Sequence, residues 1–490
     1  MNIAEALALH AQTRPLHPAL IHEKRVVLYR DLDRMVRRTA AHILSLGVKT
    51  EQIVGLALRD SIEHVVILYA LARAGIVMLP IDWRWTPGEQ FRIADHFGAH
   101  LLLVEPDRPV VDGKSCVAID ENWHTATDSA PSDLDFPVDC GPLLMSLSSG
   151  TTGRPKGPLL THAQFYHRFL IDWINLGFNA QDRYVSMTPL YFGGGRTFAM
   201  LMLYSGATVI LFPPPYEPDQ MCAEIERHRA TATFLVPTLL RRLFALDDVT
   251  LAPLRAMRTL IASGSSLHSD ERALIRSRIC PGLIVYYSST EGGGVSCLTA
   301  DEPAQYDESV GRPVFGVEVQ CVDENHQPLP AGQTGRVRYS SPGSANSFWN
   351  DDAASAESFR GKWYYPGDLG QLDDAGYLTL RGRAKDMIIR GGINVYPTEV
   401  ETILQNHPAV YEAAVVSWPS REFNEEIAAF VILNSADQLA LVTSDELRIF
   451  CKERIASYKV PREVFIVNEF PRSSMGKTLK ADLTARLAPL

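Results

Sequence analysis

Ten consecutive residues of this chain combine the groups that hold a polyphosphate. The run from Ser148 to Gly157 contains three glycines, four hydroxyl side chains and one lysine, Lys156. Glycines let backbone N–H groups turn toward an anion, hydroxyls add donors, and a lysine supplies a point charge. The order is not that of the Walker loop, because the lysine follows Arg-Pro and precedes Gly. The run predicts a phosphate-binding loop of another kind, and its simpler interpretation is an ordinary flexible loop.

A second run, from Tyr286 to Gly294, follows the apolar residues 283–285 and contains the carboxylate Glu291 and three successive glycines. In α/β sheets, ligands bind where strands end. An aromatic ring there can stack on a base, and a carboxylate is an oxygen ligand for Mg²⁺. Taken alone, the run is more typical of a plain strand end followed by a glycine turn.

Three further runs carry candidate groups. Asp368 lies in a tight turn, where it could accept both hydroxyls of a ribose or simply form an Asx turn. Lys477 follows Pro-Arg-Ser-Ser-Met-Gly, although a lysine near the end of a chain is usually a solvated charge. The run from Arg390 to Glu401 has a glycine pair and a proline near a predicted helix start. Its simpler interpretation is a strand–turn–helix connection without a ligand.

In this order and spacing, the five runs resemble the adenylate-forming superfamily of acyl-CoA synthetases, peptide-synthetase adenylation domains and luciferases. The carboxylate–CoA ligases are the most similar group, and the resemblance covers nearly the whole chain. It implies an ATP-dependent ligase that forms an acyl-AMP from a carboxylic acid, releases pyrophosphate, and then forms an acyl-CoA. The implied cofactors are ATP, Mg²⁺ and coenzyme A.

The resemblance also assigns roles to residues. The catalytic residues would be Thr290, Glu291 and Lys477, with Glu291 also the magnesium ligand, and Lys385 would be the hinge. The CoA-facing residues would be Gly391, Gly392 and Asn394. ATP would be bound by Ser148, Ser149, Gly150, Thr151, Thr152, Gly153, Lys156, Gly264, Ser265, Ser266, Tyr287, Ser288, Ser289, Asp368 and Arg383.

The acid would lie against Tyr191, Phe192, Gly193, Gly194, Val236 and Gly292. Because glycines leave space and the other lining is apolar, we expect an aromatic or medium-chain acid. Arg196 is either a structural arginine or the partner of a second polar group on the substrate, since a buried arginine needs such a partner. Four positions depart from the superfamily pattern: Ser288 replaces a glycine, Pro366 a threonine, Phe192 a frequent histidine and Arg336 a usual glutamate.

Helix and strand patterns alternate through the first part of the chain, which predicts βαβ units and a mainly parallel sheet. Predicted helices cover residues 31–46, 61–74 and 86–97, and predicted strands cover 53–58, 101–104, 208–212, 233–236 and 259–262. Short β runs fill residues 310–380. The predicted fold class is α/β, with a large N-terminal domain of βαβ subdomains and a small β subdomain at 1–384. It is hinged to a small α+β C-terminal domain at 385–490.

The bulk composition agrees with a large enzyme. Of the 490 residues, 46% are hydrophobic and 21% charged, and the net charge of −10 disfavours nucleic acid as a partner. Seven scattered cysteines argue for a reducing compartment and against a zinc or disulfide framework. No signal-peptide pattern opens the chain and its apolar runs are too short for a bilayer, so we expect a cytoplasmic protein without integral membrane association.

Two alternatives stay open at this level. One is an acyl-adenylate ligase that loads the phosphopantetheine of a carrier protein, because the acceptor thiol is chemically the same. The other is a non-catalytic nucleotide-binding or scaffold protein of the same fold. The sequence leaves open the particular acid and whether the chain acts as a homodimer.

Overall fold

The computed structural model describes residues 2–108, 115–137, 141–147, 156–390, 393–420, 423–434, 442–472 and 478–488. The chain forms two compact units, which are described separately. The N-terminal unit comprises Met1–Val319 and Tyr339–Tyr364, and the C-terminal unit comprises Gln320–Arg338 and Tyr365–Leu490. The functional division predicted at residues 384 and 385 stays a prediction.

A mainly parallel sheet forms one half of the N-terminal unit, with strand order β15-β14-β13-β12-β11-β9-β10-β1-β2 among the described residues. Its neighbours from β1 to β13 run parallel, and β2, β14 and β15 are antiparallel at the edges. The bounds are β1 Pro18–His22, β2 Arg25–Leu28, β9 Arg183–Ser186, β10 Thr208–Leu211, β11 Ala232–Leu235, β12 Thr259–Ala262, β13 Leu283–Ser289, β14 Gly293–Leu298 and β15 Arg312–Pro313.

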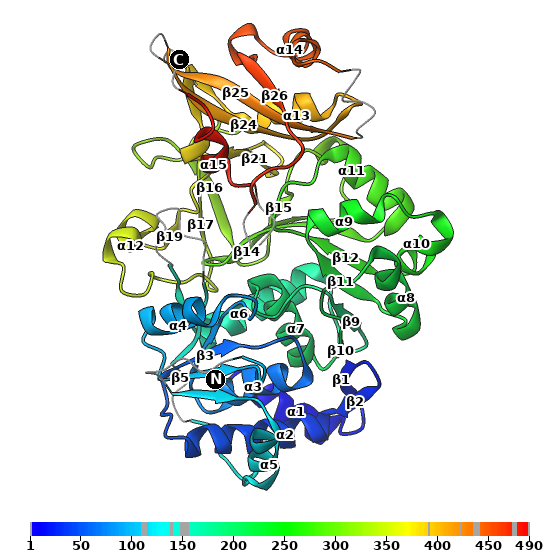
Figure 1. Ribbon diagram of the computed structural model, residues 1–490, viewed down its shortest axis with the longest axis vertical. Helices are drawn as coiled ribbons and strands as arrows, with labels where there is room; N and C mark the ends of the chain where they lie inside the picture. The colour runs from blue at the N-terminus through cyan, green and yellow to red at the C-terminus, as the bar shows by residue number, and fades with distance from the viewer. Residues whose placement is uncertain are drawn as a thin grey trace. The chain divides into compact units, whose positions relative to one another are not determined.

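A second sheet of the same unit has the order β6-β5-β3-β4-β7-β8 and is parallel except for β8. It is drawn in blue and cyan in Figure 1, whereas the central strands of the first sheet are green. The bounds are β3 Ile53–Ala57, β4 Val77–Pro80, β5 Leu101–Val104, β6 Cys116–Ala118, β7 Pro142–Met145 and β8 Leu159–Thr161. These strands read as continuous apolar runs because helices cover parallel sheets on both faces.

The helices begin and end where local chemistry predicts. Thr86 forms a capping box with Glu89 at the start of α4, and Gly47 and Gly75 take positive φ just after α2 and α3. The bounds are α1 Glu5–Thr13, α2 Tyr29–Ser45, α3 Ile62–Arg73, α4 Pro87–His96, α5 Glu121–Ser129, α6 His162–Leu176, α7 Gly193–Ser205, α8 Pro218–His228, α9 Pro237–Leu243, α10 Asp248–Arg255, α11 Ser269–Leu274 and α12 Asp352–Ser358. The predicted helices and strands are therefore confirmed to within a few residues.

The short β runs predicted between residues 310 and 380 are also present. They are β16 Glu318–Val322, β17 Gly335–Ser340, β18 Phe359–Arg360, β19 Trp363–Tyr364, β20 Asp368–Leu372 and β21 Leu378–Arg383. In the N-terminal unit Tyr339 pairs with Tyr364, and in the C-terminal unit Gly335 pairs with Gly370. Within this second group β20 and β21 form an antiparallel hairpin.

The C-terminal unit contains a sheet that buries both of its faces. Along β25 the residues Ile427, Ala429 and Val431 join one apolar cluster, and the intervening Ala428 and Phe430 join another. Side chains alternate across a strand, so this continuous apolar run requires cover on both faces. The bounds are β22 Ile388–Arg390, β23 Ile393–Val395, β24 Val410–Ser420, β25 Asn424–Leu433, β26 Glu463–Ile466, α13 Pro397–Gln405, α14 Ser444–Lys452 and α15 Lys480–Thr484.

The architecture thus has the predicted α/β class. No helix in the described part of the chain combines the length and the apolar character that a membrane span requires.

Candidate active site

Four of the predicted site segments follow neighbouring parallel strands of the first sheet. The acid segment beginning at Tyr191 follows β9, Val236 follows β11, Gly264 follows β12 and Ser288 lies near the end of β13. Because parallel strands direct their carboxyl ends to one edge, the sheet gathers these segments there. In the ribbon of Figure 1, β11 and β12 run side by side in green.

Two contacts show how close the nucleotide and acid segments are. The Ser263 and Ser288 hydroxyl oxygens lie 3.3 Å apart, which brings together the predicted ATP residues that follow β12 and those at the end of β13. A Cβ built on Gly264 would lie 3.4 Å from Cγ1 of Val236, so a predicted ATP residue adjoins a predicted acid residue. Gly264 has φ +106°, a conformation that L side chains rarely adopt.

The second run differs from its predicted form. The sequence indicated a strand ending at Val285, but β13 continues to Ser289 and turns directly into the antiparallel strand β14. The hydroxyl of Tyr286 donates to the carboxylate of Asp172 on α6, and Tyr286 is only 4% exposed. Tyr287, on the opposite face of the strand, is half-buried. Tyr286 is therefore occupied inside the protein, and the contact of Tyr287 with a base stays a prediction.

Glu291 lies in the turn between β13 and β14 and is 9% exposed. Within the described ranges, its carboxylate makes no hydrogen bond or ion pair. Mg²⁺ is usually held by one or two carboxylates together with substrate phosphates. A single buried carboxylate beside a nucleotide site fits that requirement, and Glu291 is the residue that would hold the ion.

The three glycines after Glu291 do not open space for a substrate, which corrects one part of the sequence interpretation. A Cβ on Gly292 would lie 2.1 Å from the Tyr339 hydroxyl, and one on Gly294 would lie 1.7 Å from the Tyr286 hydroxyl. A Cβ on Gly293 would lie 3.1 Å from Cγ of Arg168. The glycines are needed because three large side chains of the protein occupy that space. The predicted contact between Gly292 and the acid stays a prediction.

The acid segment is anchored by buried groups that the sequence analysis did not identify. The Leu190 N–H donates to both carboxylate oxygens of Asp60, at 3.0 and 3.1 Å. Arg84 donates to the Tyr191 hydroxyl at 2.6 Å while it also binds Asp82. Burial raises the pKa of Tyr191 to about 12, so its hydroxyl stays neutral. Tyr191 and its neighbours are thus held by contacts to residues more than a hundred positions earlier in the chain.

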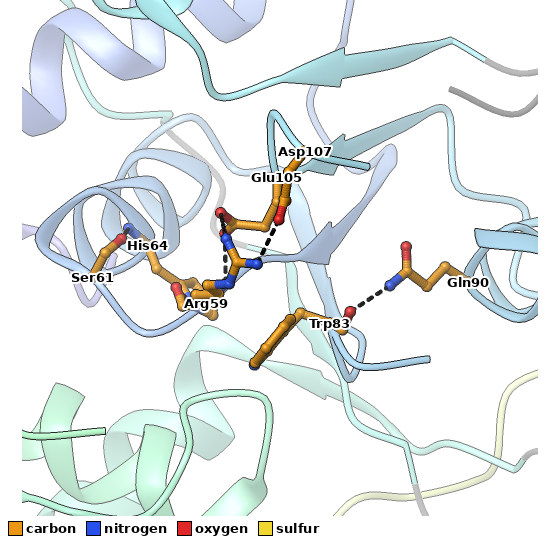
Figure 2. A network of polar contacts seen from close by, with 7 residues as sticks. All are labelled: Arg59, Ser61, His64, Trp83, Gln90, Glu105 and Asp107. Carbon is orange, nitrogen blue, oxygen red and sulfur yellow. Dashed lines mark hydrogen bonds and ion pairs between the residues drawn. The ribbon is translucent and has the colours of Figure 1, made fainter. Parts of the chain in front are cut away.

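Figure 2 shows the contacts made by Arg59, the residue before Asp60. The preceding Arg59 donates from its main chain to Glu105 at 2.7 Å and from its guanidinium to Asp107 at 2.7 Å. Its main-chain oxygen lies 3.2 Å from Nδ1 of His64, and its guanidinium lies 4.7 Å from the centre of the Trp83 ring. The turn between β3 and α3 is therefore fixed on both sides of Asp60.

Arg196 has a structural role. It is 2% exposed, and its Nη1 donates to the carbonyl oxygens of Leu190 and Tyr191 at 3.1 and 3.2 Å. Its Nη2 lies 3.4 Å from the Ser146 hydroxyl, in the segment that leads to the predicted phosphate loop. Burial lowers the pKa of Arg196 to about 9. These bonds to carbonyls support the first of the two interpretations, a structural arginine that holds the acid segment.

Part of the predicted phosphate loop lies outside the described residues, namely Ser148, Ser149, Gly150, Thr151, Thr152 and Gly153. Its end is described: Lys156 Nζ lies 3.8 Å from the Asp351 carboxylate, and the Trp349 N–H donates to the Gly157 oxygen at 2.9 Å. The loop connects the antiparallel strands β7 and β8.

In the C-terminal unit, two predicted ribose residues lie together. Asp368 and Arg383 face each other across the β20–β21 hairpin, with 3.1 Å between the carboxylate and Nε. Lys385 is exposed in the short helix Ala384–Asp386. Asn394 is exposed on β23. Gly391, Gly392 and Lys477 lie outside the described residues.

The sequence contains one pattern that could have identified two buried residues of α6, Arg168 and Asp172, which the sequence analysis did not single out. Arg168 and Asp172 are one helical turn apart on the face that also buries Phe165 and Phe169. A charged pair on an apolar helix face indicates a buried polar network. No comparable pattern marks Asp60 or Tyr339, because their partners are far away in sequence.

We predict different stability costs for alanine at two glycines of the acid segment, Gly193 and Gly195. A Cβ on Gly195 would lie 2.3 Å from the Thr188 carbonyl oxygen, whereas a Cβ on Gly193 would meet nothing within 4 Å. Gly195→Ala should therefore lower the free energy of unfolding by about 1–3 kcal/mol or more. Gly193→Ala should change it by less than about 0.5 kcal/mol. Urea unfolding measures both, and equal losses would contradict the described packing.

Asp60 gives a prediction for pH dependence. Burial raises the pKa of Asp60 to about 7, from an ordinary value of 3.8. Between about pH 4 and 7 the folded state therefore keeps a proton that the unfolded state has released, and this group makes stability fall as pH rises. Asp60→Asn removes the titration but keeps an oxygen for the Leu190 N–H. The melting temperature of the variant minus that of the wild type should increase from pH 5 to 7 and level off above about pH 8. A difference that does not vary with pH would refute the raised pKa.

Comparison with known proteins agrees with this arrangement. The AMP-binding enzyme family matches residues 7–349, and the AMP-binding enzyme C-terminal domain matches residues 399–477. The chain is 31% identical to an indoleacetate–CoA ligase of Aromatoleum aromaticum, covering 100% of this chain and 98% of the relative. It is 29% identical to a feruloyl-CoA synthase of an Amycolatopsis species, with 97% of each chain covered. ATP-bound MatB from Rhodopseudomonas palustris superposes with a TM-score of 0.91 at 25% identity, covering 99% of both chains. The chain therefore belongs to the AMP-binding enzyme family, the adenylate-forming superfamily that its motifs resemble.

Proposed function

We propose that this protein is an AMP-forming carboxylate–CoA ligase acting on an apolar carboxylic acid, aromatic or medium-chain. The observation that carries the proposal is the convergence of the acid and nucleotide segments at one sheet edge, with Val236 beside Gly264 and Ser263 beside Ser288. Membership of the family and the two relatives that act on aromatic acids support it.

In the first half-reaction, a carboxylate oxygen of the acid attacks the α-phosphorus of ATP. The bond between that phosphorus and the bridging oxygen breaks, and pyrophosphate leaves. In the second, the CoA sulfur attacks the acyl carbon, AMP leaves with the former carboxylate oxygen, and the thiol proton passes to solvent or base. The protein contributes alignment and charge stabilisation to both steps.

The residues divide these tasks. Glu291 holds Mg²⁺, which when bound neutralises charge on the phosphates. Tyr287 stacks on adenine, and Asp368 with Arg383 holds the ribose. The loop from Ser148 to Lys156 surrounds the β- and γ-phosphates.

Two chemistries in one site require two arrangements of the C-terminal domain. In the proposal, Lys477 serves the first arrangement and the Gly391–Gly392 face serves the second, with Lys385 as the pivot. A carrier-protein phosphopantetheine is the alternative acceptor. Supplying free CoA and candidate carrier proteins to the preformed acyl-adenylate distinguishes the two acceptors.

The general test is acid-dependent exchange of labelled pyrophosphate into ATP, across a panel of aromatic, medium-chain and short acids. We expect exchange with apolar acids and AMP release when CoA is added. A protein that binds ATP but catalyses no exchange with any acid would instead be a nucleotide-binding scaffold.

Lys477→Ala should separate the half-reactions. Loss of a charge contact in the transition state costs on the order of 10²–10³ in rate. We therefore expect this loss in acyl-adenylate formation, with thioester formation from supplied acyl-adenylate retained. Lys480→Ala is the matched control, because Lys480 Nζ is 2.6 Å from the Glu401 carboxylate. Equal losses in both half-reactions would reject the role given to Lys477.

Gly193→Leu should narrow the acid site, since the space beside Gly193 is open and that beside Gly194 is filled by the Phe234 ring at 2.8 Å. The value of kcat/KM for benzoate-like and octanoate-like acids should fall about tenfold or more, and that for acetate much less. Gly193→Ala should be intermediate. A wild type that prefers acetate, or a Gly193→Leu variant with unchanged selectivity, would show that the acid lies elsewhere.

A further inference from the structure

One arginine of α6 holds the main chain of the turn that carries Glu291. Arg168 is 6% exposed, and its guanidinium donates three hydrogen bonds to carbonyl oxygens. Nη1 donates to Thr290 at 3.1 Å, Nη2 to Glu291 at 2.7 Å, and Nε to Gly343 at 2.8 Å. A planar guanidinium that bonds three carbonyls fixes their relative positions, which a lysine cannot do.

The chain is shaped to admit this side chain. Cγ of Arg168 would lie 3.1 Å from a Cβ on Gly293 and 2.8 Å from a Cβ on Gly343. Both contacts are with the stem of the arginine, which has little freedom to move away. Glycine at positions 293 and 343 therefore leaves room for the stem of Arg168, so that its guanidinium reaches the turn of Thr290 and Glu291.

Arg168 is a buried cation, and its surroundings act on its pKa in opposite directions. Burial lowers the pKa of Arg168, while Tyr339, Asp172 and Glu291 act in the opposite direction. A buried arginine remains protonated and must have its donors satisfied. Here all three guanidinium nitrogens donate to carbonyl oxygens. Removing the side chain takes this partner from the oxygens of Thr290, Glu291 and Gly343.

The same turn has a second, weaker attachment. The Ala345 N–H donates to the Glu291 oxygen at 2.8 Å, and the Ser289 and Tyr339 hydroxyls lie 2.6 Å apart. These contacts come from residues 339–345, whereas Arg168 joins the turn to α6. Without Arg168 we expect the turn to stay folded but to lose its fixed position relative to α6.

We propose that Arg168 is a positioning residue for the adenylation step, which fixes the backbone of Thr290 and Glu291 and so places the Glu291 carboxylate for its metal ion and phosphates. This inference rests on the proposed function. It predicts a loss in kcat more than in affinity for the acid, because a displacement of about 1 Å in a catalytic group can cost 10²-fold in rate.

The test compares Arg168→Met and Arg168→Lys with the control Arg73→Met. Arg73 is also fully buried and donates to the Leu134 oxygen at 3.3 Å and to Asp33 at 3.0 Å, away from the proposed site. We would measure three properties of the full-length proteins. These are the melting temperature, the pyrophosphate-exchange kinetics at several Mg²⁺ concentrations, and the amide hydrogen exchange of the peptide 286–294.

For Arg168→Met we expect kcat of pyrophosphate exchange to fall about 10²-fold, KM for the acid to change less than threefold, and hydrogen exchange in 286–294 to accelerate about tenfold or more. Arg168→Lys should recover part of kcat. Arg73→Met should lower the melting temperature while it leaves kcat and the exchange of that peptide near wild type. Gly343→Ala, which retains the arginine but pushes on its stem, should reproduce the kcat loss in milder form.

Three results would overturn the inference. They are unchanged hydrogen exchange of residues 286–294 in Arg168→Met, a loss of kcat no larger than that of an equally destabilised Arg73→Met, and a rise in KM for the acid in place of the fall in kcat. A wild type that lacks acid-dependent exchange would reject the proposed function instead. In that case the hydrogen-exchange comparison would still decide whether Arg168 anchors the turn.

Discussion

Backbone direction in the nine-stranded sheet is the constraint on which the candidate site depends. β9, β11, β12 and β13 are consecutive neighbours and run parallel, so the segments that follow or end these strands meet at one edge. The chain between these strands forms helices, which are α7 and α8 before β11, α9 and α10 before β12, and α11 before β13. Segments that are far apart in the sequence can therefore hold an acid and a nucleotide side by side.

Buried polar and charged side chains then fix the segments that the sheet brings together. Asp60 and Arg196 bind the predicted acid segment through its N–H and carbonyl groups, and Arg168 binds the turn of Glu291 through carbonyl groups. Burying a charge is costly unless hydrogen bonds replace those of water. Asp60, Arg196 and Arg168 form these hydrogen bonds with main-chain groups of the predicted site segments. The bonds that compensate for burial therefore also hold those segments in place.

The glycines of the chain lie in three different surroundings that the sequence does not distinguish. Gly193 adjoins open space, and Gly264 supplies a backbone conformation with positive φ. Gly292 and Gly294 instead make room for the rings of Tyr339 and Tyr286, which pack where a Cβ would lie. A run of glycines thus marks a close approach, but only the neighbouring chain decides whether a ligand or a side chain of the protein fills the space.

The sequence by itself determined the superfamily, the α/β class and most elements, because hydrophobic period, capping residues and motif order are local properties. The helix that begins after Thr86 and the strand Thr259–Ala262 were both identified in this way. The roles of the motif residues Glu291 and Asp368 stay predictions. Only the tertiary structure decided that β13 continues to Ser289, that Asp60 holds Leu190, and that Arg168 holds the turn of Glu291. The contacts of Asp60 and Arg168 join residues more than a hundred positions apart, so they depend on how sheets and helices pack and leave no periodic pattern in the chain.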